Sequence, residues 1–293
     1  QILCFLADDK HIDALLPADV NPPLVTDAYR DVPASHDGPF PLVLFAHGFA
    51  AFRDQSTFLT AHLATWGFVV AAPDYLERGL GNALGQAPQV RYGDVELGRA
   101  TVDLVKAENA RAGGLLEGVV SADRIAITGH SAGGGSAILF GSEPDVVTFI
   151  PMSAGVRGAG GDIALPDKPS LWLTGAADGV VPLDGVEATY DLASSPKSIV
   201  VLDNAGHLAP SDLCAIGASG GGIVAIAIEA GLPVPEQLQR LGTDGCQAGA
   251  LPPADGWPVV KHFVTAQLRW AFGIDPKPVG LSQDAARGLP EAT

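Results

Sequence analysis

The run Ile125–Gly133, which reads Ile-Ala-Ile-Thr-Gly-His-Ser-Ala-Gly, constrains the fold more than any other stretch of the chain. A short apolar segment ends there in a Gly-x-Ser-x-Gly turn, and the helix-capable residues Ser136–Phe140 follow. Such a turn is crowded, and its flanking glycines leave room for neighbouring backbone. The pattern therefore predicts a strand, a tight turn and a helix, with the Ser131 hydroxyl exposed at the carboxyl edge of a sheet.

A second Gly-x-Ser-x-Gly match, Gly217–Gly221, has a different context. The segment before it, Leu213–Ile216, is short and has no strand-like run of β-branched residues, and Ser and Gly surround the match. This composition favours a flexible loop. We therefore expect Ser131, and not Ser219, to be the nucleophile.

Composition favours one large α/β domain over residues 1–293. The chain is 47% hydrophobic and only 17% charged, which is sufficient for a well-filled core. Mean hydropathy is +0.25, yet Gly, Pro or a charge interrupts each apolar run before it reaches membrane-spanning length. The net charge of −16 argues against nucleic-acid binding, which needs clustered Lys and Arg. We expect a solvated acidic surface and no membrane span.

Apolar strands and helices alternate from about residue 41 to 207, which predicts a mostly parallel central sheet with helices on both faces. A last helix over 259–272 should pack back on this sheet. The predicted strands lie at 41–46, 67–72, 125–129, 146–150, 170–174 and 198–202, and the helices at 55–66, 94–110, 136–140 and 186–192.

Two irregular stretches interrupt this alternation. Residues 74–93 are rich in glycine, and residues 208–256 are rich in Gly, Pro, Ala and Asp, with one plausible helix over 223–230. Both follow the carboxyl ends of predicted strands, where α/β sheets place their sites. The sequence leaves open whether 208–256 covers the site.

Two further residues complete a catalytic pattern with Ser131. A serine hydroxyl needs a base to take its proton and an acid to orient that base. In this architecture the order along the chain is Ser, then Asp or Glu, then His. Asp178 lies in the loop after the strand 170–174, and His207 lies in the loop after the strand 198–202. We therefore predict a Ser131–Asp178–His207 triad that transfers acyl groups through an ester on Ser131.

Each partner has a structural alternative. Asp178 precedes Gly179, and Asp-Gly is a common turn pair. Asp184 is expected to cap a helix, whereas Asp203 at a strand end is a reserve candidate for the acid. His207 could bind backbone in its loop, and His262 is expected to pack in the final helix.

The oxyanion of the tetrahedral intermediate requires two backbone N–H donors. We expect one from Ala132, directly after the nucleophile, and the other from Phe49 in the loop after the strand 41–46. His47 in that loop is expected to be structural. The candidate substrate-binding residues are Phe49, Phe52, Tyr75 and His130, although ordinary packing explains the aromatic residues equally well.

These residues together resemble the α/β-hydrolase superfamily. The run Phe45–Arg53, and the later Trp-Gly-Phe-Val-Val-Ala-Ala-Pro of 66–73, resemble its platelet-activating-factor acetylhydrolase-like branch, which is close to dienelactone hydrolases and cutinase-like polyester hydrolases. The resemblance covers about residues 40–210 and implies a serine esterase. The chain departs from this branch at 75–78, where a His is often found, in the length of 208–256, and in its short N-terminal part.

We expect the substrate to be a small-molecule, lipid or polymer ester, namely a short- to medium-chain ester, a lipid acyl ester or a polyester, and we expect no cofactor. The histidines show no metal-ligand spacing, so we expect no metal. An amidase, lactonase or peptidase with the same triad remains an alternative. A non-catalytic binding protein on this fold would be expected to have a damaged triad. The oligomeric state is open, with a monomer favoured.

Three cysteines add a constraint on residues 208–256. Cys214 and Cys246 flank one Gly-rich segment, and a disulfide between them is possible but not required by their spacing. A bridge would argue for an oxidising compartment, so we expect a secreted or periplasmic location. Cys4 is left over and is expected to be buried near an early strand. The chain opens with Gln1, and we interpret this start as processed or trimmed.

Overall fold

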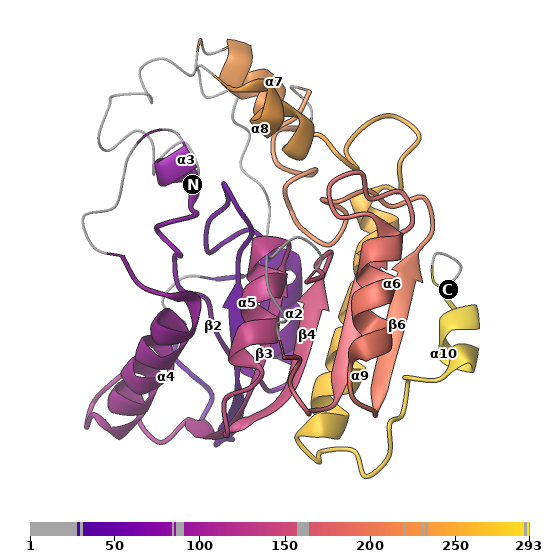
Figure 1. The fold of residues 1–293 in the computed structure, drawn as a ribbon. Coiled ribbons are helices and arrows are strands. Elements are labelled where there is room, and N and C mark those ends of the chain that lie inside the picture. The colour runs from indigo at the N-terminus through magenta and orange to yellow at the C-terminus, as the bar shows by residue number, and fades with distance from the viewer. Residues whose placement is uncertain are drawn as a thin grey trace.

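A computed structural model of the chain describes residues 28–29, 32–83, 85, 91–156, 164–218, 221–229, 231, 234–289 and 292. Within these residues the strands form a six-stranded sheet of order β2-β1-β3-β4-β5-β6, and every neighbouring pair is parallel (Figure 1). The predictions for Cys4 and Ser219 lie outside the described residues. The predicted α/β-hydrolase fold, with helices around a parallel sheet, is confirmed.

The strands follow the apolar runs of the sequence closely. β3 begins five residues before the predicted strand, and β2 is shorter than predicted because its first apolar residues complete the turn after α2. The bounds are β1 Phe40–Ala46, β2 Val69–Ala71, β3 Val120–His130, β4 Val146–Met152, β5 Ser170–Gly175 and β6 Lys197–Leu202.

The helices also follow the predicted pattern, and α4 has the predicted bounds. The final helix begins six residues earlier than predicted, with Pro253 in its first turn, where proline is tolerated. The bounds are α2 Thr57–Thr65, α3 Leu80–Ala83, α4 Asp94–Ala110, α5 Ala132–Phe140, α6 Leu183–Leu192, α7 Ile223–Glu229, α8 Glu236–Leu241, α9 Pro253–Ala271 and α10 Gln283–Arg287.

Two apolar clusters cover the two faces of the sheet. Alternate strand residues such as Val43 and Phe45 pack with α2 and α9, whereas their neighbours Leu42 and Leu44 pack with α4, α5 and α6. The division follows the two-residue period of strand side chains. Because both faces are covered, most residues of β1, β3, β4 and β5 are buried, and the carboxyl ends of these strands are held at fixed positions.

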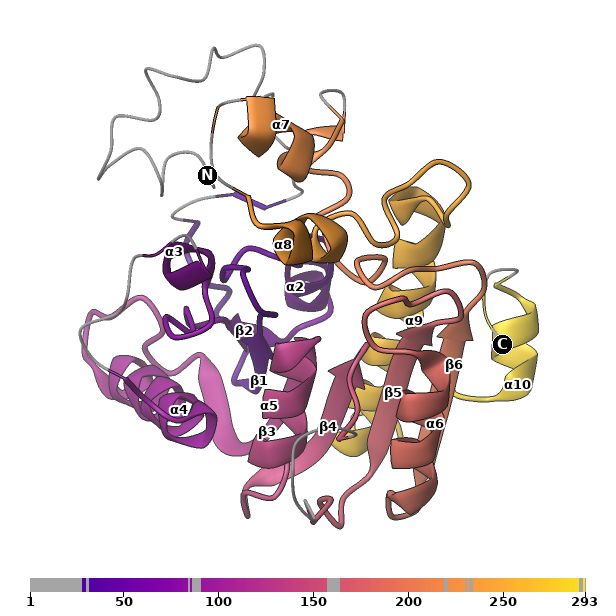
Figure 2. The same ribbon diagram turned by 45° about the horizontal axis from the view of Figure 1, so that its top comes forward.

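The segment 208–249, here called the cap segment, lies beyond the carboxyl ends of the strands. Figures 1 and 2 show its helices α7 and α8 above this edge of the sheet. The segment leaves the sheet directly after His207, and on its return the backbone N–H of Leu251 donates to the Asn204 carbonyl at 2.9 Å. Its two ends are therefore adjacent.

A disulfide and an anchor on α2 hold the cap segment. Cys214 and Cys246 are bridged, with their Cα atoms 5.0 Å apart. The Asp212 carboxylate accepts the backbone N–H of Phe58 in the first turn of α2, at 3.2 and 3.3 Å. The Trp257 indole N–H of α9 donates to the Ser211 carbonyl at 3.1 Å. The cap segment is thus attached to the helices on one face of the sheet.

None of the helices that the structure describes is long and apolar enough to cross a membrane.

Candidate active site

The turn at Ser131 has the strained geometry that the sequence predicts. Ser131 has φ 57° and ψ −121°, a backbone conformation that is unfavourable for a residue with a side chain. A Cβ on Gly133 would lie 2.0 Å from the Ala46 carbonyl oxygen, and one on Gly129 would lie 2.3 Å from the Gly133 oxygen. No side chain fits at either position, so both glycines are required for the turn.

The structure brings Ser131, His207 and Asp178 together at the carboxyl edge of the sheet. His207 Nε2 is 2.9 Å from Ser131 Oγ, and His207 Nδ1 is 2.9 and 3.1 Å from the two oxygens of the Asp178 carboxylate. An ionised carboxylate only accepts hydrogen bonds, so Nδ1 carries the ring hydrogen and Nε2 is free to accept the serine hydroxyl. The arrangement can move a proton from Ser131 to His207.

The carboxylate of Asp178 is held in its charged form. Burial by itself raises its pKa, but the hydrogen bond from His207 and those from the backbone N–H groups of Val181 and Val180 outweigh burial, so the pKa lies below its usual value. A buried carboxylate of this kind stabilises a positive charge on the neighbouring imidazole.

The loop after β1 lies directly against the turn at Ser131. A Cβ on Gly48 would be 3.3 Å from Ser131 Cβ, so the loop and the turn approach each other closely at Gly48. Phe49 is the next residue of the loop. Phe49 and Ala132 donate no backbone hydrogen bond to another residue within the described part of the chain. Ala132 opens α5, where the first N–H groups have no intrahelical partner.

Arg78 fixes the loop from the opposite side. Its Nε donates to the His47 carbonyl at 3.0 Å, and its own carbonyl accepts the Ala50 N–H at 2.7 Å. Its Nη1 donates to the Asp94 carboxylate at 2.7 Å and forms an ion pair with it. Arg78 therefore supports the loop after β1 through both its side chain and its backbone.

A chain of hydrogen bonds through Gln55 and His130 connects three loops of the site. The Gly48 N–H donates to Gln55 Oε1 at 2.6 Å, and Gln55 Nε2 donates to His130 Nδ1 at 2.6 Å. His130 Nε2 in turn donates to the His207 carbonyl at 2.7 Å. The chain fixes the relative positions of the loop after β1, the nucleophile turn and the histidine loop.

His130 and His47, two further buried histidines near the nucleophile, are neutral. Burial lowers the pKa of His130 to about 3, with a smaller contribution from His207. Burial likewise lowers the pKa of His47 to about 4. His47 Nδ1 donates to the Gly48 carbonyl at 2.8 Å, and its Nε2 accepts the Tyr75 N–H at 2.9 Å. His47 thus bonds backbone on both sides, as expected of a structural residue.

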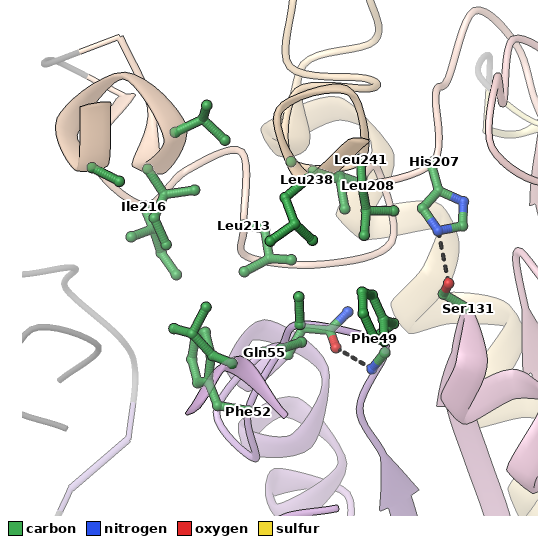
Figure 3. Close-up of a pocket in the computed structure, with 18 of the residues that line it drawn as sticks. Phe49, Phe52, Gln55, Ser131, His207, Leu208, Leu213, Ile216, Leu238 and Leu241 are labelled. Carbon is green, nitrogen blue, oxygen red and sulfur yellow. Dashed lines mark hydrogen bonds between the residues drawn. The ribbon is translucent and has the colours of Figure 1, made fainter. Parts of the chain in front are cut away.

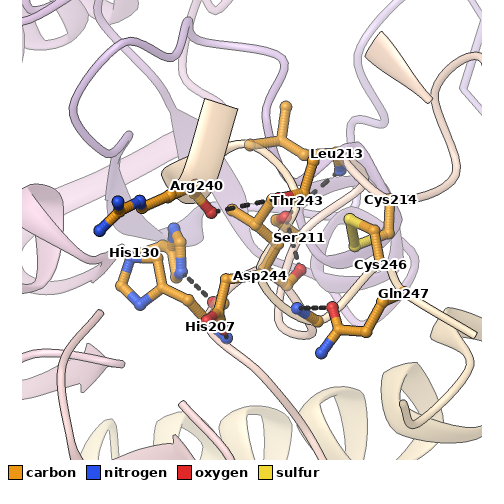
Figure 4. Close-up of a disulfide and its surroundings, with 12 residues drawn as sticks. His130, His207, Ser211, Leu213, Cys214, Arg240, Thr243, Asp244, Cys246 and Gln247 are labelled. Carbon is orange, nitrogen blue, oxygen red and sulfur yellow. Dashed lines mark hydrogen bonds between the residues drawn. A yellow bond between two sulfur atoms is a disulfide. The ribbon is translucent and has the colours of Figure 1, made fainter. Parts of the chain in front are cut away.

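Asp244 of the cap segment connects the loops of His207 and Asp178. Figure 4 shows Asp244 beside His207. Its Oδ1 accepts the His207 backbone N–H at 2.5 Å, and its Oδ2 accepts the Gly179 N–H at 3.2 Å. Asp244 lies two residues before Cys246, so the disulfide holds this carboxylate close to the site. The cap segment therefore contacts the backbone of His207 and of Gly179, the residue after Asp178.

An open pocket of about 1180 Å³, its mouth included, begins at Ser131 and His207. Phe49, Phe52 and His130, three of the residues predicted to bind substrate, line it, and their role in binding stays a prediction. The structure does not bring Tyr75 into this pocket. Tyr75 is buried edge-on against His47 under the Arg78 guanidinium, and its pKa rises to about 12 because of burial. Its predicted role in substrate binding stays a prediction.

Sequence reasoning missed Gln55, Asp212 and Asp244. Gln55 was interpreted only as the start of a helix, although a polar side chain next to the loop after β1 is a usable signal. Asp244 could have been noticed from its position two residues before Cys246. Asp212 gave no such signal, because its hydrogen bond to α2 joins residues that are 154 positions apart in the sequence.

Comparison with known proteins agrees with this geometry. Residues 31–144, less than half of the chain, match the chlorophyllase family model. A ferulic acid esterase from Streptomyces cinnamoneus has a similar structure, with a TM-score of 0.57 and 23% sequence identity, and the match covers 88% of this chain and 74% of that one. At this identity the likeness shows a shared fold.

The parallel sheet with helices on both faces and the likeness to this esterase structure define an α/β-hydrolase fold. The narrower branch that the sequence resembles, with its platelet-activating-factor acetylhydrolases, dienelactone hydrolases and cutinases, stays a prediction.

Proposed function

We propose that this chain hydrolyses carboxylic esters through an acyl-enzyme on Ser131. One observation carries the proposal: His207 lies within hydrogen-bonding distance of both the Ser131 hydroxyl and the buried Asp178 carboxylate. Three residues that are far apart in the sequence meet in the order that proton transfer from a serine requires. The match to the chlorophyllase family model and the likeness to an esterase structure support it.

The first half of the reaction forms the acyl-enzyme. His207 Nε2 takes the Ser131 proton as Ser131 Oγ attacks the ester carbonyl carbon. The carbonyl oxygen becomes an oxyanion, to which the Phe49 and Ala132 N–H groups donate. The intermediate collapses, the bond to the alcohol oxygen breaks, and the imidazolium of His207 protonates the departing alcohol. Asp178 stabilises the imidazolium throughout.

The second half returns the free enzyme. His207 takes a proton from water, and the resulting hydroxide attacks the acyl carbon. The bond to Ser131 Oγ breaks, and His207 returns the proton to that oxygen. The carboxylic acid product leaves. Phe49, Phe52 and His130, from the edge of the pocket, would contact the bound ester; both ring nitrogens of His130 are bonded within the protein, so it would do so through its ring carbons.

The test is the rate of p-nitrophenyl butyrate hydrolysis by the Ser131→Ala variant. We expect kcat/KM to fall by at least about 10⁴-fold, because the nucleophile is removed. Ser142→Ala, which changes an exposed serine beyond α5, is the matched control and should retain full activity. Retention of activity by Ser131→Ala to within tenfold would refute the proposal.

Two additional measurements sharpen the test. Phenylmethanesulfonyl fluoride should inactivate the enzyme, and mass mapping should find the added group on Ser131 alone. The p-nitroanilide of the same acid should be hydrolysed far more slowly than the ester, which distinguishes an esterase from an amidase with the same triad.

A further inference from the structure

The pocket at Ser131 has two walls from distant parts of the chain. Figure 3 shows Ser131 and His207 at one end, with Phe49, Phe52 and Gln55 on one side. The cap segment provides the opposite side through Leu208, Leu213, Ile216, Leu238 and Leu241.

The lining of this pocket is apolar beyond the reacting groups. Among the described residues that line it, no side chain is charged, and only Gln55, His130, Ser131 and His207 are polar. Gln55 is buried and already bonded at both amide atoms, since its Oε1 accepts from Gly48 and its Nε2 donates to His130. His130 is engaged at both nitrogens. Away from Ser131 and His207, the only polar side chains that line the described part of the pocket are therefore Gln55 and His130, which are already bonded within the protein.

We propose that the pocket binds one long hydrocarbon chain of the ester substrate, and that the cap segment selects this chain. The proposal rests on the proposed function and names the substrate class of the same site. A chain with hydroxyl, carboxylate or further ester groups along its length would lose hydration there without gaining a partner. A hydrocarbon chain has no such cost and gains from leaving water. A lipid-like ester thus fits better than a polyester.

The first experiment measures kcat/KM for p-nitrophenyl acetate, butyrate, octanoate and dodecanoate at concentrations where each ester is monomeric. A parallel series varies the alcohol, with ethyl, butyl and octyl acetate followed by acid release. We expect one series to rise by about fourfold per buried methylene, which corresponds to about 0.8 kcal/mol. The series that rises assigns the chain to the acyl or the alcohol side.

The outcomes separate the two proposals. If butyrate is hydrolysed by the wild type and not by Ser131→Ala, but neither series rises with length, the hydrocarbon proposal is overturned and the proposed function stands. If no ester is hydrolysed faster by the wild type than by Ser131→Ala, both are overturned. A terminal hydroxyl on the octanoate should lower kcat/KM by about 10- to 100-fold, and no effect of that hydroxyl would contradict the proposal.

Variants in the cap segment test which wall selects the chain. Leu238→Asn places an amide in the apolar wall and should lower the octanoate-to-butyrate ratio of kcat/KM by about tenfold. Ile228→Asn makes the same change at an exposed position of α7 outside the pocket lining, and should leave the ratio unchanged. An unchanged ratio in Leu238→Asn would overturn the role of the cap segment.

A second variant guards against local unfolding of the wall. Ala227→Trp adds apolar volume at the pocket lining instead of removing it, and should move the preferred chain to a shorter length. Far-ultraviolet circular dichroism and thermal unfolding would show that each variant is folded. A folded Ala227→Trp variant with the wild-type length preference would count against the proposal.

Discussion

The sheet edge and the cap segment are fixed in different ways. Ser131, Asp178 and His207 follow strands whose apolar side chains are buried in two large clusters. In the cap segment the buried apolar residues among those described are Leu208, Ala209, Pro210 and Ile226. A disulfide cross-links the segment internally, and the side chains of Asp212 and Asp244 attach it to the body. The positions of Ser131, Asp178 and His207 therefore depend on the packing of the core, whereas the position of the pocket wall depends on a few separate links.

The largest expected effect concerns the sheet edge. Asp178→Asn should lower kcat by about 10⁴-fold, because an amide favours the wrong tautomer of His207 and cannot stabilise its cation. Asp203→Asn, at the exposed reserve position after β6, is the control and should have little effect. Steady-state kinetics on p-nitrophenyl butyrate measures both, and a larger loss in Asp203→Asn would reverse the assignment of the acid.

The next effect concerns the cap segment. Replacing Cys214 and Cys246 together by Ala should lower the free energy of unfolding by up to about 4 kcal/mol, since the bridge closes a loop with a sequence separation of 32. Chemical denaturation of the chain, followed by Trp fluorescence, would measure this loss of unfolding free energy. We also expect a severalfold lower kcat, because Asp244 is less firmly held against His207.

Dithiothreitol provides the matched control for the disulfide. It should reproduce both effects in the wild type and have no effect on the double variant. Equal stability with and without the bridge would show that the remaining links suffice to hold the cap segment.

The smallest effect is a pH dependence that differs between the two regions. The pKa values of His130 and His47 are lowered from 6.5 to about 3 and about 4, so their neutral forms support folding above pH 6.5, and this support is lost as the pH falls below it. Burial raises the pKa of Asp212 from 3.8 to about 7, so its contribution is full below about pH 3.8 and is lost as the pH rises toward 7.

Asp212→Asn separates these two contributions. Relative to this variant, the wild type should lose stability between about pH 4 and 7, with a slope of up to about 1.4 kcal/mol per pH unit. The losses from the histidines below pH 6.5 should be the same in both proteins. Urea denaturation across this range measures the difference, and a constant difference would contradict a protonated Asp212 at the base of the cap segment.

The sequence predicted the sheet edge far better than the cap segment, for a physical reason. Strands such as Ser170–Gly175 are continuous apolar runs, and the glycines around Ser131 are dictated by close backbone approach, so local patterns specify both. The order of Ser131, Asp178 and His207 then follows from the connectivity of a parallel sheet. Whether these residues catalyse the reaction stays a prediction, as does the assignment of the whole chain to one domain.

The cap segment has no such local pattern. Its links to the body are made over long sequence separations, as between Asp212 and Phe58 or between Asp244 and His207, and single hydrogen bonds of this kind leave no periodicity in the sequence. The sequence also left the bridge between Cys214 and Cys246 open, because spacing does not determine pairing.

The adjacency of Leu251 and Asn204 has a consequence for how this enzyme could diversify. A stretch that departs from and rejoins a scaffold at one spot can be exchanged without rethreading the core. Because the disulfide between Cys214 and Cys246 lies wholly inside that stretch, a transplanted segment would keep its own disulfide. New ester specificities could then arise, in nature or in a library of chimaeras, by exchange of the segment 208–249 while the sheet edge stays unaltered.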